Sequence, residues 1–189
     1  MSSPPITYHP NFVDNPDEML KALQTKLEWE RRSDAPRSEY YANDIDAPYV
    51  YGNGTGRRTY FPRPYHDEIL AIRRKLEAFT STVFEVCFLN RYHNQSDHLG
   101  WHADASPEMD DARPIATISL GVEREIWFRP IGENENITKL KLAHGSMCLM
   151  LPGMQDAWQH RIPKASFQCG ERLSFTFRGY VQQEAGGAV

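Results

Sequence analysis

The chain has 189 residues, of which 40% are hydrophobic and 12% aromatic, and this composition excludes a disordered protein. A formal net charge of −4 excludes a surface that is basic throughout, although basic residues outnumber acidic ones between Lys21 and Lys75. Between Gln95 and Glu135 the acidic residues are in excess, which would suit a bound cation. An ordinary mixed surface explains both local imbalances equally well.

The start of the sequence has no basic and apolar leader, and no apolar run reaches about 18 residues. We therefore expect a soluble intracellular protein with no membrane span. It would be cytoplasmic in a bacterium and cytoplasmic or nuclear in a eukaryote. Cys87, Cys148 and Cys169 lie in or beside apolar segments, which favours buried free thiols over disulfides or zinc ligands. The length predicts one domain over 1–189, and we expect a monomer.

Two amphipathic helices are predicted in the first half, after a short strand over 6–13. Asn15 is a candidate N-cap, Pro16 suits the first helical position, and apolar residues follow at helical spacing, so the first helix is expected over 16–28. The second helix is expected over 66–83, where an apolar stripe again recurs every three or four residues.

The segment from Ser33 to Tyr65 follows neither period. It holds six tyrosines, several arginines and a glycine-rich turn at 52–56. One interpretation is a binding loop or lid, in which the tyrosines stack on bases and the arginines contact phosphates. The other is a tyrosine-rich β-hairpin that packs on the core, and the sequence does not decide between them.

Short β-type segments follow one another from Phe84 onward, separated by glycine and proline turns. Helices first and strands second predict an α+β chain whose second part is a sandwich or barrel. The predicted strands span 84–92, 115–121, 124–129, 138–142, 145–151, 156–161 and 171–180.

One histidine and one carboxylate, His102 and Asp104, stand two residues apart. On a strand both side chains would share a face, and a further histidine would complete a facial triad for non-haem iron. His144 and His160 are the candidates for the third ligand. The motif is weak by itself, because a chain with seven histidines often contains such a pair by accident.

The first and last predicted strands of the second half each have polar residues on one face. Asn90 and Tyr92 share a face of 84–92, and the last strand aligns four polar residues, including two arginines. If this face points inward, its arginines need an anionic partner such as a bound carboxylate. If the strand lies at an edge, the same face is simply solvated. The four polar residues are Arg172, Ser174, Thr176 and Arg178.

Taken together, these motifs resemble the AlkB family of Fe(II)- and 2-oxoglutarate-dependent dioxygenases. The resemblance covers about residues 84–179 closely and the first part loosely. The elements occur in the family's order: Asn90-Arg91-Tyr92, His102-x-Asp104, Pro114 to Gly121, Leu142 to Ser146, His160, and Arg172-Leu-Ser-Phe-Thr-Phe-Arg178.

The resemblance implies a double-stranded β-helix, or jelly roll, over 84–180, preceded by helices and a nucleotide-recognition lid over 1–83. It implies Fe(II) as the metal and 2-oxoglutarate and O2 as cosubstrates. It assigns His102, Asp104 and His160 to Fe(II), and Asn90, Tyr92, Arg172 and Ser174 to 2-oxoglutarate, with Arg178 beside the cosubstrate and Asp104.

The implied substrate is an alkylated base in DNA or RNA, demethylated with release of formaldehyde, succinate and CO2. Tyr49 and Tyr51 match the lid's Y-x-Y pattern, so Tyr51 is the expected stacking residue. Trp158 and Arg161 flank His160 and are expected to line the same pocket.

The sequence departs from the family in one place. Repair enzymes of the family usually have an acidic residue two places after the metal aspartate, where this chain has Ser106, with Glu108 as a substitute nearby. A hydroxylase or demethylase acting on a protein or small molecule is therefore the alternative. A binding module that has lost catalysis is the third hypothesis, and the complete set of ligands and arginines counts against it.

Overall fold

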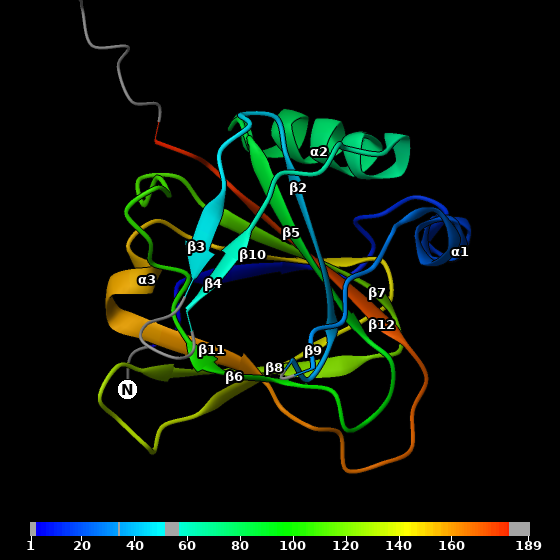
Figure 1. Ribbon diagram of the computed structural model, residues 1–189. Coiled ribbons are helices and arrows are strands. Elements are labelled where there is room, and N and C mark those ends of the chain that lie inside the picture. The colour runs from blue at the N-terminus through cyan, green and yellow to red at the C-terminus, as the bar shows by residue number, and fades with distance from the viewer. Residues whose placement is uncertain (1–2, 34, 52–56, 182–189) are drawn as a thin grey trace, which may run out of the picture.

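The computed structural model describes residues 3–33, 35–51 and 57–181, except for the side chain of Tyr51 (Figure 1). The helices are α1 (Pro16–Lys26), α2 (Asp67–Thr80) and α3 (Met154–Ala157). The strands are β1 (Ile6–His9), β2 (Ser38–Asn43), β3 (Tyr49–Tyr51), β4 (Arg58–Tyr60), β5 (Val86–Tyr92), β6 (Leu99–His102), β7 (Ile115–Gly121), β8 (Arg124–Pro130), β9 (Thr138–Leu142), β10 (Ser146–Met150), β11 (Trp158–Ile162) and β12 (Arg172–Arg178).

Two antiparallel sheets face each other and form the jelly roll (Figure 1). The larger has the order β1-β10-β7-β12-β5-β2, and the smaller has the order β6-β11-β8-β9. Strands β3 and β4 pair separately as an antiparallel hairpin. Because β12 lies between β7 and β5, it is a central strand, and its polar face cannot be the solvated face of an edge.

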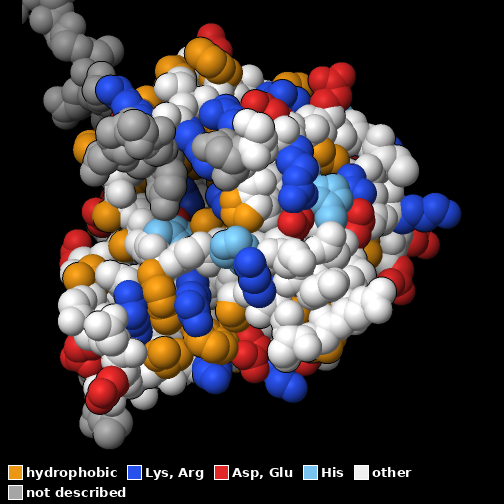
Figure 2. Space-filling view, turned by 60° about the horizontal axis from the view of Figure 1, so that its bottom comes forward, with side chains coloured by type: hydrophobic (Ala, Val, Ile, Leu, Met, Phe, Trp, Pro, Cys, Tyr) orange, Lys and Arg blue, Asp and Glu red, His pale blue; other side chains and the backbone are white. Residues whose placement is uncertain are grey.

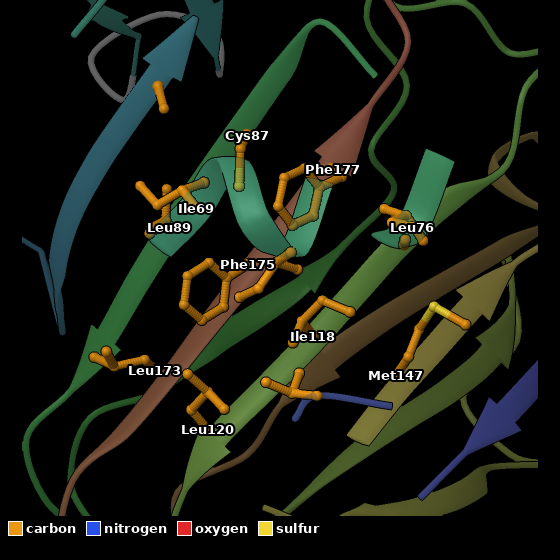
Figure 3. Packing of buried hydrophobic residues seen from close by; sticks show 14 of the residues in the cluster. Ile69, Leu76, Cys87, Leu89, Ile118, Leu120, Met147, Leu173, Phe175 and Phe177 are labelled. Carbon is orange, nitrogen blue, oxygen red and sulfur yellow. The ribbon is translucent and has the colours of Figure 1, made fainter. Parts of the chain in front are cut away.

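Helices α1 and α2 cover the outer face of the six-stranded sheet (Figure 1). Leu23 of α1 and Ile69 and Leu76 of α2 are fully buried in one cluster with residues of the sheet. Figure 3 shows Ile69 and Leu76 beside Leu89 and Phe175. This layer closes the outer face, so the polar residues of the same strands point to the space between the two sheets.

Helix α1 begins at Pro16 as predicted, with acidic residues in its first turn. Asn15 occupies the N-cap position as predicted, but its side chain makes no cap hydrogen bond. Asn15 instead adopts a left-handed conformation with φ of 49°, which asparagine tolerates better than most residues.

Several predicted boundaries differ from those observed. The strand expected over 6–13 ends at His9, and the strand expected from 156 is preceded by α3. Strand β2 lies inside the segment that we expected to hold only a lid or a hairpin, and it pairs with β5. Strands β1 and β2 are therefore the two edges of the larger sheet, which draws on both halves of the chain.

All three cysteines are free, and Cys87 and Cys148 are buried as predicted, whereas Cys169 is half-buried. Among the helices of the described residues, none has the length and apolar character that crossing a membrane requires.

Replacing Phe175 by alanine tests the packing between α2 and the larger sheet. Phe175 is fully buried and stacks on Phe177, so we expect a loss of about 3–5 kcal/mol in the free energy of unfolding. Denaturant titration measures this loss. Phe61→Ala is the matched control, because Phe61 is 71% exposed and should change stability by about 0.5 kcal/mol or less. Equal losses in both variants would contradict this account of the core.

Candidate active site

A β-bulge in β6 places His102 beside His160. His102 pairs with His160 and Leu99 pairs with Ile162, so three residue steps on β6 oppose two on β11. The extra residue lets both Leu99 and His102 face the pocket, while Trp101 between them turns to the outer face. The prediction that His102 and Asp104 lie on one strand is only partly right, because β6 ends at His102 and Asp104 lies after the strand.

The side chains of His102, Asp104 and His160 converge in the pocket, and their ligand atoms all lie within 4.8 Å of one another. His102 Nε2 is 3.6 Å from Asp104 Oδ1, and His160 Nε2 is 3.6 Å from Asp104 Oδ2. The backbone N–H of Asp104 donates a hydrogen bond to Gln155 Oε1 at 2.8 Å, and this bond holds the residue in place. These three groups could hold a metal ion in the facial arrangement that leaves positions open for reactants.

The charge state of the three groups suits a metal. Burial lowers the pKa of His160 to about 3, with the charge of His102 acting in the same direction. Burial also lowers the pKa of His102, against the opposing effect of Asp104. Burial alone would raise the pKa of Asp104, but Arg178 and the two histidines together lower it. Neutral imidazoles and an ionised carboxylate are the forms that bind metal.

Hydrogen bonds leave the ligand atoms available. His102 Nδ1 lies 2.9 Å from the carbonyl of Gly100, a contact that fixes Nδ1 as the donor and frees Nε2. Asp104 Oδ1 accepts a hydrogen bond from Arg178 at 2.5 Å, whereas Asp104 Oδ2 is buried and has no hydrogen-bond partner among the described residues. An unpartnered buried carboxylate oxygen is costly, and a bound cation would remove that cost.

Arg172 is fully buried behind the pocket. Its guanidinium donates to Ser119 Oγ at 2.9 Å and to Ser174 Oγ at 3.2 Å, and it lies 5.3 Å from the centre of the Tyr92 ring. Its Nη1 is buried with no hydrogen-bond partner in the described part of the chain, and burial lowers the pKa of Arg172 to about 10. The site therefore fits an anion such as a carboxylate.

The polar faces of β5 and β12 point inward, which decides between the two alternatives left open for the last strand. Asn90, Tyr92, Ser174 and Arg178 line the pocket, while the alternate residues of both strands pack under the helices. Phe84 was expected to begin the strand, but it precedes β5 and lies in the cluster under the helices.

Arg37 belongs to the pocket, although the sequence placed it only among candidate phosphate contacts. It is buried, its Nε donates to Asn90 Oδ1 at 2.5 Å, and its Nη2 lies 2.7 Å from Glu39 Oε1. This bond directs the amide of Asn90. The spacing of Arg37 and Glu39 on one face of an extended segment was the available signal for their pairing.

Aromatic rings form the other wall of the pocket. Tyr49 of β3 and Tyr60 of β4 stack at 6.2 Å with an interplanar angle of 24°, and Phe88 meets Tyr60 edge to face at 4.7 Å. Tyr49 thus lies where the sequence predicted, whereas the side chain of Tyr51 lies outside the described structure. Tyr60 was missed, because a single tyrosine in an aperiodic segment gives no directional signal. Phe88 lies on β5, on the face that Asn90 and Tyr92 share.

Other sequence-predicted residues lie away from the pocket. Ser106 and Glu108 hydrogen-bond to each other and are not among the lining residues described. Trp158 is buried in a separate apolar cluster, and Arg161 lies on the outer face of β11, so their position differs from the predicted one. His144 accepts a hydrogen bond from the Gly121 N–H outside the site, which leaves His160 as the third candidate ligand.

Comparison with known proteins gives the family. A sequence model of the 2OG-Fe(II) oxygenase superfamily matches residues 7–178. The chain belongs to this superfamily. Its members use Fe(II) and 2-oxoglutarate, the two groups that fit the three convergent ligands and Arg172.

The relatives are AlkB-like, as the sequence motifs predicted. The chain is 29% identical to human alpha-ketoglutarate-dependent dioxygenase alkB homolog 3 over 92% of its own length and 65% of that protein. It is 28% identical to mouse DNA oxidative demethylase ALKBH2 over 76% of the chain and 61% of that protein. The chain thus spans slightly less than two thirds of these relatives. The solved structure of OsALKBH1 shares the fold, with a TM-score of 0.66, 15% identity, and coverage of 95% and 98% of the two chains.

His160→Ala tests the metal site. Removing one of three ligands should weaken Mn(II) binding, used as a redox-stable substitute for Fe(II), by roughly 100-fold or more in a calorimetric titration. His144→Ala is the matched control, because His144 lies outside the pocket, and it should bind Mn(II) like the unaltered protein. Unchanged affinity in His160→Ala would show that the metal binds elsewhere.

Arg172→Lys tests the anion site. Lysine keeps the charge but loses the planar pair of donors, so the KM for 2-oxoglutarate should rise about tenfold to hundredfold. Succinate formation measures the change. Arg91→Lys is the control, because Arg91 pairs with Glu171 outside the pocket. A normal KM in Arg172→Lys would remove this arginine from the cosubstrate site.

Proposed function

We propose that the chain is a dioxygenase domain that uses Fe(II), 2-oxoglutarate and O2 to demethylate alkylated bases in DNA or RNA. One observation carries the proposal: a single pocket combines three convergent metal-ligating groups with a wall of aromatic rings. Because both sheets contribute to this pocket, we propose one catalytic domain over 1–189, and the free cysteines support an intracellular location.

His102, Asp104 and His160 would hold Fe(II), and Arg172, with Ser174, Asn90 and Tyr92, would hold the carboxylates of 2-oxoglutarate. When bound, the metal and cosubstrate supply the oxidation of a substrate C–H bond by O2, with conversion of 2-oxoglutarate to succinate and CO2.

The chain's own residues would orient the reactants. Arg178 keeps Asp104 ionised and binds one of its oxygens, which leaves the other oxygen available to a metal. Arg37 fixes the side-chain oxygen of Asn90, which leaves the amide NH2 free for the cosubstrate.

Tyr49, Tyr60 and Phe88 would contact a planar base and exclude water from it. We propose that the β3–β4 hairpin acts as the nucleotide-recognition lid, because it carries two of these rings. Hydroxylation of an N-methyl group gives a hemiaminal that loses formaldehyde, so demethylation needs no hydrolytic base in the pocket.

Nucleic acid is favoured as substrate by the names of the relatives, which include a DNA oxidative demethylase. The position two residues after Asp104 favours the second candidate, a dioxygenase acting on a protein or small molecule. This position is Ser106, whose hydroxyl donates a hydrogen bond to Glu108. Neither side chain is among the described residues that line the pocket, where it could recognise a base.

Formaldehyde release from a panel of methylated single-stranded oligonucleotides tests the proposal. We expect release that requires Fe(II) and 2-oxoglutarate and disappears in His102→Ala. Oxidation of 2-oxoglutarate without formaldehyde from any methylated base would favour the second candidate. Turnover retained in His102→Ala would contradict the site itself.

A further inference from the structure

A row of alternating cations and tryptophans crosses the outer face of the four-stranded sheet. The guanidinium of Arg129 lies 4.3 Å from the ring centre of Trp101. Arg161 lies between two indoles, 4.9 Å from Trp101 and 4.3 Å from Trp127. The ammonium of Lys139 is 4.2 Å from Trp127. We call these five residues the tryptophan–cation row.

Strand order and register create the row. In the order β6-β11-β8-β9, Arg161 is the direct partner of Trp127, and Trp127 is the direct partner of Lys139. The bulge in β6 turns Trp101 outward to meet Arg161. The face that comes forward in Figure 2 shows blue and orange side chains alternating below the pale-blue histidines.

The positive charge of the row is not neutralised within the described residues. Arg129 donates only to the neutral side chains of Gln159 and Asn134. The Nε of Arg161 is buried and has no hydrogen-bond partner, and no ion pair is found for Arg129 or Arg161 in the described part of the chain. The guanidiniums of Arg129 and Arg161 both lie close to the Trp101 ring centre, at 4.3 Å and 4.9 Å, and repel each other, so an added anion would stabilise the arrangement.

Neighbouring acidic residues are already engaged. Glu125 accepts a hydrogen bond from the indole N–H of Trp127, and Glu123 pairs with Lys141. The row therefore presents three cations on one face of a protein whose net charge is −4. Such a local excess is complementary to a polyanion.

We propose that the tryptophan–cation row binds the phosphodiester backbone of the single-stranded nucleic acid whose base enters the pocket. The inference rests on the proposed function and extends it to a second surface. Cations cover the indole faces, so the rings hold the cations in place rather than stack on bases. Trp101 and Arg161 directly adjoin His102 and His160 in the chain, so one end of the row lies on the two strands that carry the histidines of the candidate metal site.

The double variant Arg129→Gln with Lys139→Gln tests the row. Binding of an unmethylated single-stranded oligonucleotide of about 15 nucleotides is measured by fluorescence anisotropy at several salt concentrations. We expect affinity to fall about tenfold at low salt, and the slope of log affinity against log salt to decrease by about 1.4, or about 0.7 per lost phosphate contact.

The matched control is Lys21→Gln with Arg74→Gln. These exposed residues lie on α1 and α2, over the other sheet, and the pair removes the same charge. The control should keep the affinity and slope of the unaltered protein. Lys139→Gln alone changes an exposed position and should reduce the slope by about half as much as the double variant does. This single variant distinguishes a lost phosphate contact from a folding defect in the double variant.

A second measurement compares methylated substrates of two lengths. The row variant should raise the KM for the long oligonucleotide about tenfold and leave kcat and the KM for a trinucleotide unchanged. Unchanged affinity and slope in the row variant, or an equal loss in the control, would contradict the proposed role of the row. If the unaltered protein demethylates the trinucleotide but does not bind the oligonucleotide, the role of the row is contradicted and the proposed function is not. If the row variant loses binding and no protein demethylates any substrate, the proposed function is contradicted and the role of the row is not.

Discussion

The burial of Asp104 is the constraint on which the rest of the structure depends. A carboxylate that is only 2% exposed must be paired, because an isolated buried charge costs several kcal/mol. Arg178, itself buried at the end of β12, supplies one partner. Their contact joins the larger sheet to the segment after β6, at the pocket between the two sheets.

Two of the buried side chains at the pocket that have an atom without a hydrogen-bond partner among the described residues are of opposite charge. Asp104 Oδ2 lacks a donor or cation, and Arg172 Nη1 lacks an acceptor. A divalent metal and a dicarboxylate supply what the two groups lack. The superfamily's metal and cosubstrate therefore follow from the charges that the fold buries as well as from the sequence comparison.

Residues on strands could be predicted from the sequence, because alternation fixes the direction of a side chain. Alternation predicted that Ser174 and Arg178 share a face, and the central position of β12 turns that face to the pocket. The order of motifs selected His160 over His144. Prediction failed where alternation is broken or absent. The bulge that turns Trp101 outward leaves no clear mark in the sequence, and Arg37 and Tyr60 come from a segment without periodicity. Arg161 was assigned to the pocket by its proximity to His160, although the period of two on β11 points it to the opposite face.

The most direct test of the central claim is a crystal structure of the protein grown without O2 in Mn(II) and 2-oxoglutarate. The account predicts one metal bound by His102 Nε2, Asp104 Oδ2 and His160 Nε2, with one carboxylate of 2-oxoglutarate within hydrogen-bond distance of Arg172. A metal outside this triad, or 2-oxoglutarate with neither carboxylate at Arg172, would contradict it.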